Sequence, residues 1–259
     1  MKFETGIRSI AIVSICCLAA FAASSRSGAP AAGDKKDKAK PAPVQTVDSG
    51  SFGVFIRGQR VVTETFSVHQ ENGVSVIKAQ LKEVNGSDAS SQKSSLEITS
   101  SGELLRYEWS QPSGGSLTVT PNNDFLMEKI TPPNATKAAE KPFLMPATSS
   151  ILDNNFFVHR EVLVWRYLTA DCKTEAGDLK CQKDPAQFGV LIPQDQNSMS
   201  VRLELVGREK IKIRDTEREL LRLNLTGESF EWSLWVDPQD QFKLIKVAIP
   251  ADNVEVVRD

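Results

Sequence analysis

The chain has 259 residues, of which 40% are hydrophobic, so it can bury a sizeable core without a metal or a lattice of disulfides. Its 31 basic and 33 acidic residues give a formal net charge of −2, which is not the balance of a globally basic, nucleic-acid-binding surface. Composition therefore predicts one or two globular domains and gives no reason to expect nucleic acid or an anionic surface as a partner.

The N-terminus has the order of a secretory signal peptide. Lys2 and Arg8 precede an apolar run that is short for a membrane span, and Ala20-Phe21-Ala22 supplies a small-residue cleavage site. Residues 1–22 are therefore predicted to be a signal peptide. The protein is then exported to the periplasm or the extracellular space, where it can associate with the cell envelope, and no transmembrane span remains after signal removal.

Residues 23–48 are rich in alanine, proline and lysine. They hold too few apolar groups to offset the entropy of ordering the chain, so a flexible leader is predicted.

The mature chain keeps two of the four cysteines, Cys172 and Cys181. In an oxidising compartment, two cysteines that close a short loop are most often joined by a disulfide. A redox pair or a metal site is the alternative, but the spacing is not C-x-x-C and no histidine lies close in sequence. A disulfide loop over 172–181 is expected.

From residue 49 the sequence pattern is that of short strands separated by turns, which predicts a single β-rich domain over 49–259. Turn signals such as Asn72-Gly73 join neighbouring strands in antiparallel order. A crossover is expected over 131–146. Strands are expected at 51–56, 60–69, 74–82, 95–99, 103–110, 116–120, 125–130, 187–192, 199–206, 209–213, 219–226, 230–236, 242–249 and 254–257.

The stretch 146–168 predicts the one long helix. Ser150 followed by Asp153 resembles a capping box, and apolar residues then recur at three- and four-residue steps. The pair Asn154-Asn155 is a poor helix former, but the pattern as a whole favours a helix over about 150–168.

Strands before and after one crossing helix predict a mainly β fold. We expect a large curved antiparallel sheet or an incomplete β-barrel, with one main helix packed across its concave side. A two-sheet sandwich with the helix at its edge is the alternative. The wide apolar stripe of the helix favours the curved sheet.

The sequence contains no recognisable catalytic motif. Its two histidines, His69 and His159, lack a metal-ligand spacing such as H-E-x-x-H, and neither a G-x-S-x-G elbow nor a phosphate-binding glycine loop is present. No catalytic residue, metal or cofactor is therefore expected. His159 is expected to be partly exposed or hydrogen-bonded in a structural role.

A surplus of large apolar side chains on the helix and the last hairpin is the remaining feature. In an open half-barrel, some of them would line a cleft between sheet and helix, which is the usual setting for an apolar ligand. The candidate ligand-lining residues are Phe156, Val162, Trp165, Phe230, Trp232 and Trp235.

Two segments carry a family resemblance. The pattern G-x-F-x-V-F-I-x-G-x-R-V that begins at Gly50, and the ending L-W-V-D-P-Q-D-Q-F-K-L-I-K-V-A-I-P, resemble a group of uncharacterised bacterial periplasmic β-proteins. Their implied architecture is similar to the half-barrels of lipoprotein-carrier (LolA-type) proteins, in which a curved sheet with helices across its mouth holds acyl chains. The resemblance implies a half-barrel fold and supplies no functional-residue motif.

Three functions follow from these observations. The first is an exported, non-enzymatic binding module for a hydrophobic ligand such as a lipid or an acyl chain. The alternative is a structural or protein-interaction module of the cell envelope with a fully packed interior, and the third is an envelope hydrolase that depends on His69 or His159. The packing between helix and sheet discriminates between the first two.

Overall fold

The computed structural model describes residues 44–175 and 178–259. The predicted signal peptide 1–22 and most of the predicted leader 23–48 lie outside these residues. The end of the predicted leader, however, belongs to strand β1, where Val47 packs against the core and Asp48 is buried beside Arg258. The β structure therefore begins at Gln45, before the predicted boundary at residue 49.

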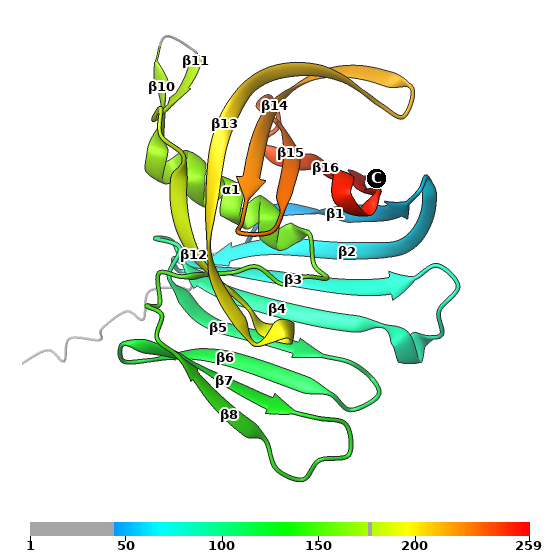
Figure 1. Ribbon diagram of the computed structural model, residues 1–259, viewed down its shortest axis with the longest axis vertical. Coiled ribbons are helices and arrows are strands. Elements are labelled where there is room, and N and C mark those ends of the chain that lie inside the picture. The colour runs from blue at the N-terminus through cyan, green and yellow to red at the C-terminus, as the bar shows by residue number, and fades with distance from the viewer. Residues whose placement is uncertain (1–43, 176–177) are drawn as a thin grey trace, which may run out of the picture. The chain divides into compact units, whose positions relative to one another are not determined.

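One fifteen-stranded sheet makes up most of the described chain and curves around the helix α1 (Figure 1). Its strand order is β8-β7-β6-β5-β4-β3-β2-β1-β17-β16-β15-β14-β13-β12-β9, so the last strand pairs with the first. Neighbours are antiparallel except β9 and β12, which pair in parallel over two residues. The predicted curved sheet with one helix is confirmed. The sheet is open, with β8 and β9 at its edges.

The elements have the following bounds. The strands of the first half are β1 (Gln45–Ile56), β2 (Gln59–Glu71), β3 (Val74–Glu83), β4 (Gln92–Thr99), β5 (Leu104–Ser110), β6 (Ser116–Asn122), β7 (Phe125–Thr131), β8 (Ala139–Phe143) and β9 (Ser150–Ile151). After α1 (Val158–Asp171) come β10 (Cys172–Glu175), β11 (Asp178–Cys181), β12 (Ala186–Ile192), β13 (Asn197–Ile213), β14 (Thr216–Thr226), β15 (Glu231–Asp237), β16 (Lys243–Ile249) and β17 (Val254–Arg258). Three short 3-10 helices are η1 (Asp88–Ser90), η2 (Pro193–Asp195) and η3 (Pro250–Asp252).

Tight turns join many of the neighbouring strands. In the turn between β2 and β3, Asn72 and Gly73 have φ angles of 50° and 78°, and Arg57 and Gly58 between β1 and β2 have 51° and 80°. Two-residue hairpin turns of this kind need positive φ at both positions, which glycine adopts without a steric penalty. The turn residues therefore fix the antiparallel order that the sequence predicts.

Four strands, β8, β9, β10 and β11, were not predicted. β8 lies in the expected crossover, and four of its five residues are exposed, so it lacks the alternation that marks a half-buried strand. β10 and β11 form a separate hairpin in which Cys172 and Cys181 face each other and are joined by the predicted disulfide. The two strands expected over 199–213 are one strand, β13, interrupted by a bulge near Gly207.

The helix begins at Val158, and the prediction that it begins near residue 150 is wrong. Ser150 belongs to β9, and the Asp153 carboxylate accepts the amide of Asn155 in a local turn. The first amide groups of α1, those of Phe157 and Val158, instead donate to the Glu64 carboxyl on β2 over 2.6 and 3.1 Å. The cap comes from a residue more than ninety positions away, which no local pattern can reveal.

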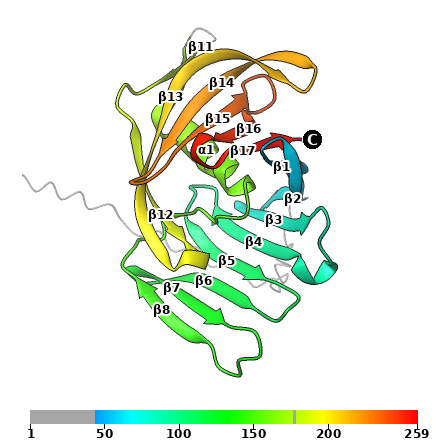
Figure 2. The ribbon, with the colours of Figure 1, turned by 45° about the vertical axis from the view of Figure 1, so that its right-hand side comes forward.

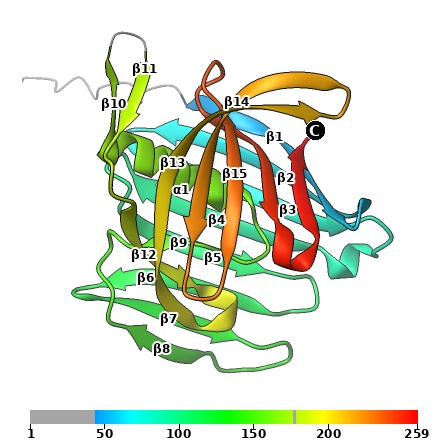
Figure 3. The same ribbon diagram turned by 45° about the horizontal axis from the view of Figure 1, so that its top comes forward.

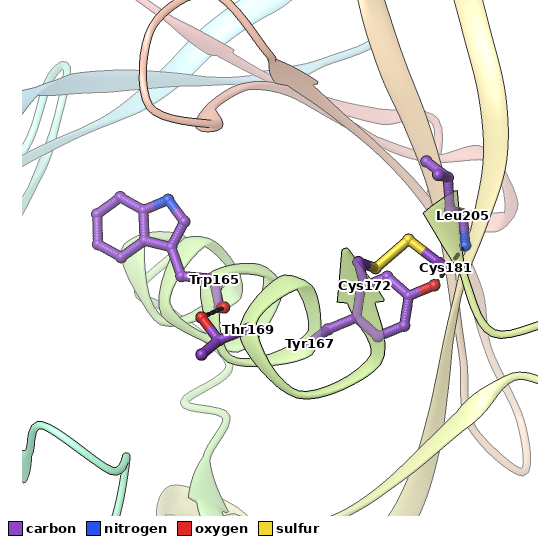
Figure 4. The surroundings of a disulfide bond; sticks show 6 residues. All are labelled: Trp165, Tyr167, Thr169, Cys172, Cys181 and Leu205. Carbon is purple, nitrogen blue, oxygen red and sulfur yellow. Dashed lines mark hydrogen bonds between the residues drawn. A yellow bond between two sulfur atoms is a disulfide. The ribbon is translucent and has the colours of Figure 1, made fainter. Parts of the chain in front are cut away.

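The helix lies inside the curve of the sheet, with strands on both of its sides (Figures 2 and 3). Towards β13, the Leu205 amide donates to the Tyr167 hydroxyl over 3.1 Å. Figure 4 shows Trp165 leaving the opposite side of the helix, and its indole N–H donates to the Phe242 carbonyl over 3.2 Å. Because α1 fills the concave space, its packing decides whether any interior cavity remains.

We predict that Cys172→Ser will lower the free energy of unfolding by about 2 to 3 kcal/mol, because a loop of this length restricts the unfolded chain by that amount in the chain-entropy model. Urea denaturation of the oxidised protein and the variant measures the difference. An unchanged midpoint would show that the hairpin β10–β11 melts independently of the sheet.

Candidate functional site

A cavity of about 370 Å³ lies between one side of α1 and the sheet. The helix residues that line it recur at three- and four-residue steps from His159 to Ala170, so they share one side of α1. At about 1.5 Å per residue, this side is roughly 16 Å long. The opposite wall comes from β2–β5, the turn between β4 and β5, and residues 149–151. The cavity is therefore elongated along the helix.

The lining combines an apolar wall with neutral polar groups and a single cation. The apolar lining residues include Leu96, Ile98, Leu104, Ile151, Val162, Leu163 and Trp165. Gln70 and several serine and threonine residues provide hydrogen-bonding groups, and Arg166 provides the positive charge. No aspartate or glutamate of residues 44–175 and 178–259 lines the cavity. The space suits an apolar ligand that carries a polar end.

Of the six residues predicted to line a ligand site, two line the cavity. Val162 and Trp165 do so. Phe156 is fully buried in the core beside the cavity and is not part of its lining. The rings of Phe230 and Trp232 lie tilted against each other at 4.8 Å between centroids, and the Arg160 guanidinium lies 4.9 Å above the Trp232 ring. Phe156 and Trp232 therefore contact the first turn of α1, through His159 and Arg160 respectively.

Trp235 lies on the other face of the sheet. It belongs to a separate apolar cluster with Ile213, Leu220 and Ile245. Arg222 and Lys246 lie over its ring, and its indole N–H donates to Glu209 over 3.1 Å. The prediction that Trp235 lines a cleft under the helix places it on the wrong face, because successive side chains of a strand alternate between faces and Leu234 takes the inner one.

A buried polar cluster holds the N-terminal turns of α1. The Glu64 carboxyl, which is fully buried, accepts the two amides at the helix start. The Asp153 carboxylate accepts hydrogen bonds from the Tyr107 hydroxyl and from the Gln194 side-chain amide. Arg160, also fully buried, donates to the main-chain carbonyls of Asp153 and Phe156. Each group satisfies a polar atom that would otherwise be buried without a partner.

A second set of buried contacts holds the helix at Glu161, the residue that follows Arg160. The Glu161 carboxyl accepts the Leu244 amide of β16 over 2.6 Å and an Arg258 N–H over 3.1 Å. Arg258 also donates to both oxygens of Asp48, each over 2.7 Å. Burial raises the pKa of Glu161 well above its ordinary value, whereas Asp48 keeps a lowered pKa beside Arg258. The two carboxyls therefore share one guanidinium.

His159 differs from its expected environment. It is 1% exposed, and neither ring nitrogen has a hydrogen-bond partner among the described residues. Burial lowers its pKa to about 3, so the imidazole is neutral. The expectation that His159 is partly exposed or hydrogen-bonded is therefore wrong. Its ring packs edge-on against Tyr107 at 5.7 Å and contributes to one end of the cavity lining.

The buried ionisable groups do not form an accessible catalytic site. Glu64, Asp153, Arg160 and Glu161 are fully buried, and none of them lines the cavity. His69, the other histidine proposed for a hydrolase, lies on β2 beside the Thr46 hydroxyl. In the part of the chain that the structure describes, no three His, Cys, Asp or Glu side chains are placed to hold a metal ion. The arrangement is that of an anchor for the helix.

Comparison with known proteins gives no relative from which a function could be transferred: no family model, no curated protein and no solved structure matches this chain. Within residues 44–175 and 178–259, none of the helices is both long and apolar enough to cross a membrane. The site must therefore be interpreted from its own geometry.

Sequence reasoning missed Glu64, Arg160 and Arg166. One signal was available in the run His159-Arg160-Glu161, because three successive helix positions point in directions about 100° apart. In a helix surrounded by strands, such a run must bury at least one ionisable group. The partners of Glu161, which are Leu244 and Arg258, come from distant strands and could not be predicted.

The Glu64 carboxyl predicts a specific pH dependence of stability. Burial raises its pKa from 4.5 to about 8, so between these pH values only the folded state retains the proton. Stability linked to Glu64 is therefore fully present below pH 4.5 and is lost as the pH rises towards 8. Relative to Glu64→Gln, the wild type should lose up to about 1.4 kcal/mol per pH unit within this window.

Urea denaturation from pH 5 to pH 8 tests this dependence. The exposed Glu219→Gln variant is the matched control and should follow the wild type. A free-energy difference between the wild type and Glu64→Gln that stays constant across the window would contradict a raised pKa for Glu64.

Proposed function

We propose that the protein is an exported, non-enzymatic binding module that holds a hydrophobic ligand, such as a lipid or an acyl chain, between α1 and the concave face of the sheet. The observation that carries the proposal is the cavity of about 370 Å³ under the helix. Small-molecule sites usually measure about 300 to 1,000 Å³, with mostly apolar walls and a few polar groups. This cavity has that size and that lining.

The same cavity argues against a scaffold with a fully packed interior. Protein cores are close-packed, with few voids larger than a water molecule. Elsewhere the concave side is packed in this way: Val158, Val164, Leu234 and Val247 are all fully buried in one core. The space between α1 and β2–β5 departs from this close packing along one side of the helix.

The fixed position of α1 also supports binding. The contacts of Glu64, Arg160 and Glu161 hold the N-terminal turns of α1 to strands on both sides. Binding to a preformed cavity loses less free energy to ordering the protein than binding to a cavity that must open first.

Export agrees with two features. The disulfide Cys172–Cys181 is typical of oxidising compartments. The N-terminal sequence has the order of a secretory signal.

Binding is tested with a neutral apolar probe, N-phenyl-1-naphthylamine, whose fluorescence rises in an apolar environment. We predict saturable uptake by the wild type and at least tenfold weaker uptake by Val162→Trp, because the larger ring fills the cavity. Val206→Trp, at a 53% exposed position on β13, is the control and should bind like the wild type.

The opposite results would sink the proposal. If the wild type takes up no probe, or if Val162→Trp binds as well as Val206→Trp, the space under α1 is not a binding site. Thermal melting of both variants separates a filled cavity from an unfolded protein.

A further inference from the structure

Arg166 is placed at the boundary between the cavity and the surface. Its side chain lines the cavity on one side and an open groove beside β12 on the other. One guanidinium N–H donates to the Ser150 hydroxyl over 2.8 Å, and the guanidinium lies 5.4 Å above the Phe188 ring. These two contacts hold the planar group at the edge of the apolar space.

The charge of Arg166 is not neutralised by a neighbouring carboxylate. Within residues 44–175 and 178–259, Arg166 forms no ion pair, and burial lowers its pKa. Asp171 lines the outer groove with Arg166 but makes no ion pair with it. The hydroxyl of Ser150 and the ring of Phe188 replace only part of the hydration that this partly buried cation loses.

The surroundings of Arg166 favour an anion from outside the chain. Ser100, Ser101, Ser149 and Ser150 line the same cavity and carry hydroxyl groups. Gly102, in the turn between β4 and β5, also lies beside Arg166, since a Cβ at that position would lie 3.6 Å from Cδ of Arg166. An arginine fork beside hydroxyl groups matches the oxygens of a carboxylate or a phosphate.

We propose that the ligand is a single-chain amphiphile with an anionic head group, and that Arg166 binds the head while the chain lies along α1 towards His159. This inference rests on the proposed binding function. The volume is near the lower end for ligand sites, which leaves room for one chain and not for several. The lining also favours an anionic over a cationic ligand, because among the described residues it contains the cation of Arg166 and no carboxylate.

The test compares ligands that share one chain and differ in the head: decanoate, decyl phosphate, decanol and decyltrimethylammonium. Isothermal titration below the micelle concentration should show decanoate or decyl phosphate binding on the order of tenfold more tightly than decanol, since charge-assisted hydrogen bonds contribute that much. The cationic ligand should bind most weakly. The tighter of the two anions identifies the head group as a carboxylate or a phosphate.

Three variants assign the preference to one residue. Arg166→Gln should reduce anion binding to the level of decanol, and Arg166→Lys should retain part of the preference. Arg202→Gln, which removes an exposed arginine from β13, is the matched control.

The outcomes separate this inference from the proposed function. If all four heads bind the wild type equally, or if Arg166→Gln keeps the anion preference, the inference fails and the binding function stands. If neither these ligands nor the neutral probe binds the wild type, the binding function itself fails. Should Arg166→Gln not fold, the wild-type head-group series and Arg166→Lys still decide the question.

Discussion

The interior depends on the buried hydrogen bonds between the Glu64 carboxyl and the first two amides of α1. The α-helix of the described chain runs inside a curved sheet, so its position sets the space on both of its sides. Arg160 and Glu161 add contacts to the opposite strands, at Trp232 and Leu244. Fixed in this way, the helix packs closely against β13–β16 and leaves the cavity towards β2–β5.

This arrangement uses polar groups where a packed core would use apolar ones. Burying carboxyls and a guanidinium costs desolvation, which close hydrogen bonds offset only when the geometry is good. These polar contacts instead fix the position of the helix, because several directional hydrogen bonds define where the helix starts and how it is rotated about its axis. A rotation of about 100° would give each residue the direction of its chain neighbour and would change which residues face the cavity. The polar anchor therefore maintains the shape of the proposed binding site.

Much of the fold could be predicted from the sequence, because the strands and turns are specified locally. Alternating side chains and pairs such as Asn72-Gly73 place most strands within a few residues of their observed bounds. The start of α1 could not be predicted, because Glu64 supplies the cap from another strand while Asp153 is used in a turn. The site was predicted only in part. Val162 and Trp165 follow from the apolar stripe of the helix, but an arginine such as Arg166 is normally solvated and gives no signal of its place at a cavity.

The central claim, that the helix is fixed over a preformed apolar cavity, is tested most directly by methyl NMR under xenon pressure, because xenon enters dry apolar cavities without a specific head group. The account predicts chemical-shift changes at the methyl groups of Ile98, Leu104 and Val162, and none at Val158 and Leu234, which lie in the packed core. Absent shifts at the first three residues, or equal shifts throughout the core, would contradict it.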